Sequence, residues 1–495
     1  MSERLFQRLD TAKTQYYHFK AVTVTGMGLF TDAYHIFSIT PILRLLGHVY
    51  YESNDNQIPP SVECSMLAIA LLGTVIGELV FGRLGDIVGR RRLYGLALMF
   101  MMAGSFGSGF SMGTSRGCVL ASLGFFRFFL GVGIGGDYPL SATIMSEYAN
   151  KTMRGAFMAA VFSMQGFGIL ASSVVTMAVC KIFSRIYPSP PSDPTPKEAD
   201  MAWRLILMLG VVPAAATFYW RMKIPETARY TALVEKNVPQ ATSDMERVLE
   251  MSHRQIAEGH PLQPSLSSYP LFSKQFFLRH GRNLLACSAA WFLLDIVFYS
   301  SSLFQSKIYH KYLRDEHTGK AVTAFEVASL QAIVACYSTI PGYIAVLFLI
   351  DRVGRLSIQA IGFVLMAIVY FAIGVPYDRY WRSHTNKLFM FLYGLTFFFA
   401  NCGPNTTTFI LPAELFPARF RTTCHGIAGA AGKVGAIIGV VGFLMASQDD
   451  DQNGHKKALG GRFTLVTLSG ICVVGMAVTN LFTKETKGTS LEENE

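Results

Sequence analysis

Long apolar runs dominate the hydrophobic pattern of this chain, and the polar stretches between them are short. A helix of about 20 apolar residues spans a bilayer, whereas strands of membrane barrels alternate polar and apolar positions and are about ten residues long. The pattern therefore predicts an all-α membrane protein. Its twelve predicted spans are 20–46, 64–84, 93–112, 117–145, 155–181, 202–222, 282–305, 323–350, 356–376, 386–412, 424–446 and 460–483.

The composition agrees with this prediction. Apolar residues make up 51 % of the chain and charged residues only 15 %, whereas soluble proteins carry about 25 % charge. The formal net charge of +10 indicates basic cytoplasmic loops rather than nucleic-acid binding, since no basic patch is interleaved with aromatic residues. The eight cysteines are scattered, and neither they nor the histidines have metal-ligand spacing. We expect no cofactor and no metal.

The distribution of basic residues also predicts which loops face the cytoplasm. They gather in alternate loops, which the positive-inside rule places in the cytoplasm together with both termini. The proline-rich segment 189–200 then faces outward. The charged N-terminus lacks a cleavage pattern, so we expect the first span to remain in the protein.

Two loop motifs occur twice at nearly constant offset. Such parallel repeats are typical of transporters that rock one half against the other. We predict two homologous six-helix halves, 1–222 and 282–495, joined by a cytoplasmic linker, 223–281, with an amphipathic helix starting near Ser243. The repeats are Asp86 to Arg90 with Asp351 to Arg355, 265 residues later, and Glu147 and Arg154 with Glu414 and Arg421, 267 later.

These loop motifs each combine a carboxylate with an arginine. An acid near a helix N-terminus beside an arginine can form a latch that opens and closes. Positive-inside anchoring explains the extra arginines but not the repeated acids. We therefore predict gating residues, paired within each motif: Asp86 and Arg90, Glu147 and Arg154, Glu226 and Arg229, Asp351 and Arg355, Glu414 and Arg421.

The stretch from Gly131 to Gly136 reads GVGIGG and matches a dinucleotide fingerprint. A fingerprint of that kind needs a preceding strand and a soluble fold. Here the glycines lie inside an apolar span, where small residues let helices pack closely.

Polar residues inside the predicted spans carry the functional signal. Asp32, Asp137 and Asp295 are intramembrane acids, and such groups usually form ion or substrate sites. Structural pairing, for example of Lys433 with one aspartate, would explain one acid but not three. Lysine surrounded by neutral donors favours a small anion, and acids beside it favour an anion that carries protons. The donors are Tyr138, Gln165, Trp291, Tyr299 and Asn405.

Four segments resemble the signature of the plant and fungal phosphate:proton symporters of the major facilitator superfamily: GMGLFTDAY, GGDYPLSATIMSE, AAWFLLDIVFYSSSLFQS and GPNTTTFILPAELFPARFRTTCHGIAGAAGKVGAIIG. The resemblance implies the superfamily's twelve-helix fold and a plasma-membrane location. It also implies roles for individual residues. Phosphate would contact Tyr138, Gln165, Trp291, Asp295, Tyr299, Asn405 and Lys433, and protons would pass through Asp32, Asp137 and Asp295.

His35 departs from this family, because close relatives usually carry a second acid at that position. Histidine titrates near neutrality, so we include His35 in the predicted proton path.

We therefore expect a multi-pass transporter that imports inorganic phosphate with protons by alternating access. Its partners are phosphate, protons and membrane lipid, without nucleic acid, and homo-oligomer formation is left open. A sugar or organic-ion carrier is the nearest alternative, and the central lysine disfavours a sugar. A phosphate receptor would need a signalling domain, and a channel would not need three buried acids. An enzyme is disfavoured because the sequence shows no set of nucleophile and base.

Overall fold

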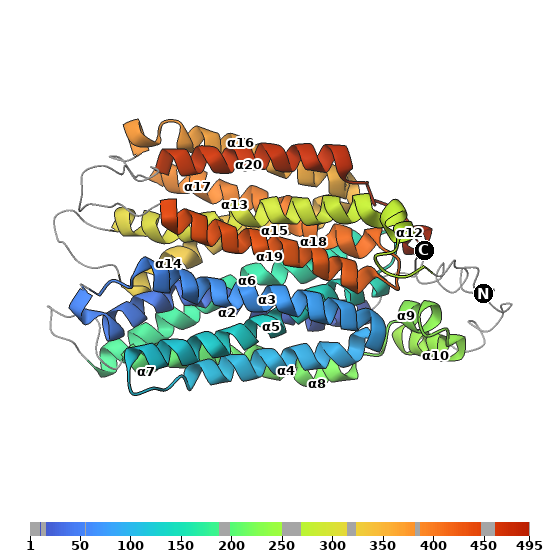
Figure 1. Ribbon diagram of the computed structural model, residues 1–495, viewed down its shortest axis with the longest axis horizontal. Helices are drawn as coiled ribbons and strands as arrows, with labels where there is room; N and C mark the ends of the chain where they lie inside the picture. Colours follow the sequence, from blue (N-terminus) through green and yellow to red (C-terminus); the bar gives the residue numbers. More distant parts are fainter. Residues whose placement is uncertain are drawn as a thin grey trace.

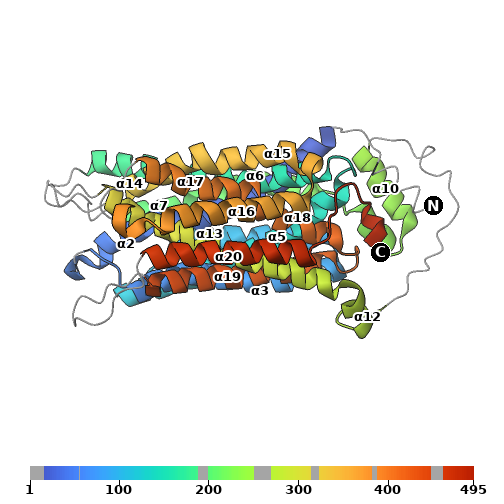
Figure 2. The ribbon, with the colours of Figure 1, turned by 90° about the horizontal axis from the view of Figure 1, so that it is seen from above.

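The computed structural model describes residue 10 and residues 16–54, 56–187, 199–249, 269–313, 323–381, 387–446 and 461–494. Most of the predicted outward-facing segment, 189–198, lies outside these ranges. Long helices run side by side along the longest axis of the molecule (Figures 1 and 2). The short helices α9 (Ala228–Leu233) and α10 (Val238–Leu249) lie beyond one end of this bundle. We call that end the α9–α10 end and the other the opposite end.

Each of the twelve predicted spans coincides with one helix or with consecutive helical segments. The first six are α2 (Tyr16–Tyr50), α3 (Pro60–Val88), α4 (Arg90–Gly109), α5 (Arg116–Tyr148), α6 (Arg154–Ile186) and the pair α7–α8 (Ala199–Leu209 and Val211–Lys223). The last six are α13 (Arg282–Leu313), α14–η3–α15 (Ala324–Val334, Ala335–Thr339, Ile340–Val353), α16 (Arg355–Gly374), α17–α18 (Lys387–Cys402, Pro404–Leu415), α19 (Arg421–Ala446) and α20 (Gly461–Phe482). In the described ranges, nine of the helices are long and apolar enough to cross a membrane. The all-α prediction is confirmed.

The repeated D-x-x-G-R motif forms the same turn twice. Gly89 connects α3 to α4 with φ of 103° and ψ of 154°, and Gly354 connects α15 to α16 with φ of 107° and ψ of 158°. Side chains other than glycine rarely adopt such positive φ values. The motif glycines therefore turn the chain between two antiparallel spans.

Glycines in the GVGIGG stretch bring α5 against α3. A Cβ atom added to Gly131 would lie 2.1 Å from the carbonyl oxygen of Ala70, and one added to Gly135 would lie 2.2 Å from that of Thr74. Because these distances are far below van der Waals contact, only glycine allows the two backbones to approach this closely. The stretch serves helix packing, as the sequence predicted.

Contacts between the first six spans and the last six run along two seams. In one seam α3 packs against α19, and in the other α6 packs against α14 and α15. Residues on both sides of each seam therefore meet in the middle of the bundle. The division into halves 1–222 and 282–495 remains a prediction.

The linker, 223–281, contains α9 and α10, then the short elements α12 (Lys274–Phe276) and η2 (Phe277–Gly281). Helix α10 begins at Val238, five residues before the predicted start. The reason is local, since the side chain of Asn237 accepts a hydrogen bond of 3.1 Å from the backbone N–H of Gln240. Asparagine at that place satisfies a donor that the first helical turn leaves free.

Candidate functional site

All seven predicted phosphate ligands line one cavity in the middle of the bundle. Five helices contribute them, two from the first six spans and three from the last six. They are Tyr138 from α5, Gln165 from α6, Trp291, Asp295 and Tyr299 from α13, Asn405 from α18 and Lys433 from α19. The spacing of four residues along α13 places three of them on one helix face, as predicted.

An ion pair spans this central cavity. The ammonium group of Lys433 donates to a carboxylate oxygen of Asp295 at 2.9 Å, and both side chains are almost fully buried. The same ammonium group lies 5.2 Å from the ring centroids of Tyr138 and Tyr299, within the range of a cation–π interaction. Lys433 thus has one strong partner that a bound anion would have to displace or share.

Amide and hydroxyl groups line a further part of the wall, beside apolar residues such as Phe37 and Phe162. Gln165 donates to the hydroxyl of Tyr138 at 2.9 Å. Asn405 donates to the hydroxyl of Tyr343 at 3.1 Å and to the side-chain oxygen of Asn401 at 2.7 Å. Because these groups hold one another in place, their donors are oriented before any ligand arrives.

Asp137 has a partner that the sequence did not reveal. The guanidinium of Arg221, near the end of α8, donates to both of its carboxylate oxygens at 2.5 and 3.2 Å. Both side chains are fully buried, and Arg221 also lies 4.1 Å above the ring of Tyr94. Gly28 of α2 makes room for this pair, since a Cβ atom there would lie 1.8 Å from a guanidinium nitrogen. The Asp137–Arg221 pair is neutral as a unit.

Asp32 and His35, both on α2, have no such partner. Both carboxylate oxygens of Asp32 and both ring nitrogens of His35 are buried without a hydrogen bond in the part of the chain that is described. The ring of His35 lies against Gly210, where a Cβ atom would come within 2.1 Å of it. An unpaired carboxylate in such surroundings is strongly disfavoured unless it is protonated.

Sequence reasoning missed two further buried charges. Glu78 of α3 is 0 % exposed, and Arg127 of α5 is 1 % exposed. Both carboxylate oxygens of Glu78, and Nε and Nη1 of Arg127, lack a hydrogen-bond partner among the described residues. The signal was present, because Glu78 lies in the apolar run GTVIGELVF and Arg127 in FFRFF. The rule that singled out the three aspartates applies equally to both.

At the α9–α10 end, two predicted gating acids bind helix N-termini across the seams. Asp86, in the last turn of α3, accepts hydrogen bonds from the backbone N–H groups of Thr422 (3.2 Å) and Thr423 (2.8 Å) in α19. Asp351, in α15, accepts from those of Gly155 (3.2 Å) and Ala156 (2.8 Å) in α6. Each acid thus satisfies free donors at the positive end of a helix from the other set of spans.

Arginines reinforce this closed end, with partners that partly differ from the prediction. Arg90 and Arg421 both bind Glu147, at 3.3 and 2.8 Å, and Arg355 binds Glu414 at 2.8 Å. The Asp86–Arg90 and Asp351–Arg355 pairs are present at 3.4 and 2.8 Å.

The predicted pairing of Glu147 with Arg154, and of Glu226 with Arg229, is wrong. Arg154 and Arg229 instead bind Asp10 at 3.1 and 2.8 Å, and Glu226 accepts from the backbone N–H of Arg91 at 3.1 Å. Glu147 lies at the end of α5 and Arg154 at the start of α6, while Glu226 precedes α9, so neither pair shares a helix face and other arginines reach the acids from packed helix ends.

The C-terminal segment joins this network through η5 (Leu491–Asn494). Arg229 donates to Glu492 at 2.7 Å. Burial alone would raise the pKa of Glu492, but the Arg229 guanidinium and the Ser490 hydroxyl lower it to about 2. Burial raises the pKa of Glu226. Glu492 therefore stays ionised, and bound to Arg229, at any pH near neutrality.

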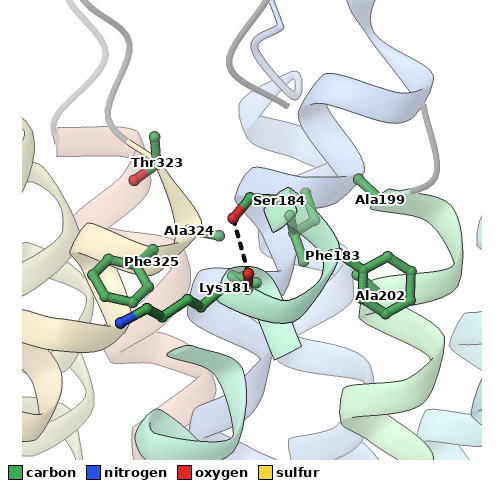
Figure 3. A pocket seen from close by; sticks show the side chains of 10 residues that line it. Lys181, Phe183, Ser184, Ala199, Ala202, Thr323, Ala324 and Phe325 are labelled. Atoms are coloured by element: carbon green, nitrogen blue, oxygen red, sulfur yellow. Dashed lines mark hydrogen bonds between the residues drawn. The ribbon is translucent and has the colours of Figure 1, made fainter. Parts of the chain in front are cut away.

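A second cavity lies near the opposite end, between α6, α7 and the start of α14 (Figure 3). Its wall is mostly apolar, with Phe183, Ala202 and Phe325 among the lining residues, and Lys181 extends towards α14. None of the predicted site residues lines it. The central cavity is therefore the candidate site.

Comparison with known proteins assigns the chain to a transporter family. The model of the family described as sugar (and other) transporter matches residues 21–495. The chain is 58 % identical to the probable inorganic phosphate transporter 1-8 of Arabidopsis thaliana, with 100 % of this chain and 95 % of that protein covered. It is 48 % identical to the low affinity inorganic phosphate transporter 3 of Petunia hybrida, with 99 % and 94 % covered.

Solved structures show the same architecture. The proton:xylose symporter XylE bound to 6-bromo-6-deoxy-D-glucose superposes with a TM-score of 0.73 at 19 % identity, covering 97 % of this chain and 98 % of that one. The human organic anion transporter MFSD10 gives 0.61 at 16 % identity, covering 94 % and 100 %. These two likenesses establish the fold, which is that of the major facilitator superfamily.

Proposed function

Because the chain belongs to the sugar (and other) transporter family of the major facilitator superfamily, we propose that it imports inorganic phosphate with protons across the plasma membrane by alternating access. The family makes the chain a transporter and not an enzyme. Phosphate as the substrate is supported by the names of the plant relatives, which are inorganic phosphate transporters. Proton coupling is supported by the charges of the central cavity.

The observation that carries the proposal is the balance of charges around Lys433. The Asp137–Arg221 pair is neutral, so the acids left to act on Lys433 include Asp295, which lines the cavity with it, and the unpaired Asp32, which lies outside the cavity lining but within electrostatic range. With Asp295 and Asp32 ionised and Glu78 neutral, these groups and Lys433 together hold one negative charge in excess and repel an anion. Binding a proton on either acid removes this excess. Anion binding and proton binding therefore favour each other in this cavity.

Asp295 is the residue that links the two ligands in this proposal. Its carboxylate holds the ammonium group of Lys433 at 2.9 Å. A proton on Asp295 releases that ammonium group, which then binds the phosphate oxygens. The donors of Tyr138, Gln165 and Asn405 complete the oxyanion site, and Asp32 passes protons to it together with His35.

The network at the α9–α10 end supports a state closed on that side. We assign this end to the cytoplasm, because basic residues concentrate there. Opening it would separate α3 from α19 and α6 from α15, so the halves 1–222 and 282–495 move about the central cavity and the linker joins them. Importing one monovalent anion against 100 mV costs about 2.3 kcal/mol, which co-transported protons supply.

Purified protein in liposomes tests the proposal. Labelled phosphate uptake should follow an imposed inward proton gradient and stop when an uncoupler dissipates it. Uptake that ignores the gradient would disprove symport. Xylose and sulfate in the same assay test the sugar and other-anion alternatives, and uptake of xylose but not phosphate would replace the proposal with the sugar alternative.

A further inference from the structure

Arg127 is a buried cation without an acidic partner. It lies on α5 ten residues before Asp137, which places it about 15 Å nearer the opposite end. Its side chain is buried, and the described residues provide neither an ion pair nor an acceptor for its Nε and Nη1 groups. Of the titratable groups, His35 faces it closely enough to feel its charge. A charge kept in the membrane at this cost usually serves a function.

The guanidinium lines a cavity of its own. Thr40 of α2 and Ser302 of α13 are among the polar residues that line it. Ile36, Phe37 and Tyr299 line both this cavity and the central one. The two cavities are therefore neighbours, and the one at Arg127 lies towards the opposite end.

We propose that Arg127 forms an outer oxyanion site, where phosphate binds before it reaches Lys433. This inference rests on the proposed function. A guanidinium presents a planar fork of donors that matches two oxygens of one phosphate, and the nearby hydroxyls add further donors. The aromatic side chains of Phe37 and Tyr299 stand between the sites, and their movement passes the anion on.

Uptake kinetics in cells that express the full chain test this site. Arg127→Met should raise KM for external phosphate at least tenfold while kcat changes less, and Arg127→Lys should give an intermediate KM. KM for efflux of internal phosphate should stay unchanged, because that route begins at the other end. Arg116→Met, which removes an exposed arginine from the same helix, is the matched control and should leave both values unchanged.

Binding separates this inference from the proposed function. Purified Lys433→Ala protein should still bind inorganic phosphate weakly by calorimetry, and adding Arg127→Met should abolish that binding. Wild-type KM in a folded Arg127→Met protein, an equal rise in KM for both directions, or unchanged binding in the double variant would each overturn the outer site. Absence of phosphate uptake by the wild type would overturn the proposed function instead, and the binding result would still decide on Arg127.

Glu78 supports a second inference on separate grounds. It lies on α3, where that helix packs against α19, and it faces Gly429, whose added Cβ atom would lie 2.8 Å from Oε1. Gly429 precedes Lys433 by four residues, so Glu78 lies about 6 Å from the level of Lys433 on the side of the α9–α10 end. It is therefore placed between the central cavity and the closed gate.

The charged groups that act on Glu78 are Lys433 of α19 and Asp295 of α13, and Glu78 in turn acts on Asp32 of α2. Lys433 is already paired with Asp295, and neither oxygen of Glu78 has a hydrogen-bond donor among the described residues. An ionised carboxylate is strongly disfavoured there, whereas water would reach it once α3 and α19 part.

We infer that Glu78 carries a proton in the closed state and releases it to the cytoplasm when the α9–α10 end opens. This step adds one proton to those moved with each phosphate, and it too rests on the proposed function. The reversal potential of phosphate-driven current in liposomes gives the number of charges moved per phosphate. Glu78→Gln should lower that number by one, whereas Glu78→Asp should keep the wild-type value.

Glu63→Gln, at the start of the same helix, is the control and should leave the number unchanged. An unchanged number in Glu78→Gln, or a drop that Glu63→Gln shares, would overturn the role of Glu78. Wild-type uptake without any proton dependence would instead overturn symport itself.

Discussion

Arg221 makes a sharp test of how Asp137 is used. Arg221→Met removes the guanidinium that donates to both oxygens of Asp137 and leaves a fully buried carboxylate. In the folded variant, Asp137 is then either ionised without a partner or protonated. Breaking a buried ion pair by removing one partner typically costs about 3–5 kcal/mol.

Protonation of Asp137 in the folded variant gives a second estimate of the stability loss. A carboxyl with an ordinary pKa near 4 costs about 1.4 kcal/mol to protonate for each pH unit above that value, hence about 4 kcal/mol at pH 7. In the variant, the folded state holds a proton on Asp137 that the unfolded state releases. Stability therefore falls as pH rises, and the loss at pH 5 should be smaller than at pH 7 by about 2.7 kcal/mol.

Unfolding of the purified variants in mixed micelles, at pH 5 and pH 7, measures these differences. The double variant Asp137→Asn/Arg221→Met carries no charge and should recover most of the stability. Proton-driven uptake by the double variant then tests the predicted role of Asp137. Uptake that keeps its proton dependence would mean the pair is structural. A loss below about 1 kcal/mol for Arg221→Met at pH 7, or a loss independent of pH, would refute the reasoning on the pair.

Three further variants probe the cavity, the proton path and the gate. Lys433→Ala should reduce phosphate uptake to background, because the central cavity loses its cation, and near-normal uptake would contradict the site. His35→Asp should change the pH profile of uptake, and an unchanged profile would remove His35 from the proton path. Glu147→Gln removes the carboxylate that holds Arg90 and Arg421, so the buried Cys424 should react faster with an impermeant maleimide, as mass spectrometry of its peptide would show. Unchanged labelling would mean that Glu147 does not hold this end closed.

The spans were predictable because an apolar run long enough to cross a membrane must satisfy its backbone hydrogen bonds within itself, and a helix does so. The first span, predicted as 20–46, extends over Tyr16–Tyr50. A membrane helix continues past the apolar core, to where water can bind the free backbone groups at its ends. The turn at Gly89 was also readable, because D-x-x-G-R occurs twice at equivalent places. Spacing along α13 placed Trp291 and Tyr299 with Asp295. The remaining cavity residues were recognised as polar residues inside apolar spans, and the resemblance implied their contacts with phosphate.

Partners of buried charges were less predictable. Arg221 follows Asp137 by 84 residues, and no local pattern links two residues that distant in sequence. Two of the predicted gating pairs were wrong for the same reason, since Glu147, for example, binds Arg421 from the other repeat instead of Arg154. Glu78 and Arg127 are different, because each stands alone in an apolar run and could have been recognised from the sequence.

At the α9–α10 end, each set of spans supplies one aspartate that binds a helix start of the other set, and this reciprocal arrangement affects how the end opens. Asp86 holds the start of α19 and Asp351 holds the start of α6, so two equivalent clasps lie on the two seams. If one half rotates about the central cavity, as proposed, it strains both clasps together, whereas breaking one clasp alone leaves the other intact. The proposed alternating access then requires the two seams to open together, and it disfavours a state with only one seam open, which would leak protons without phosphate.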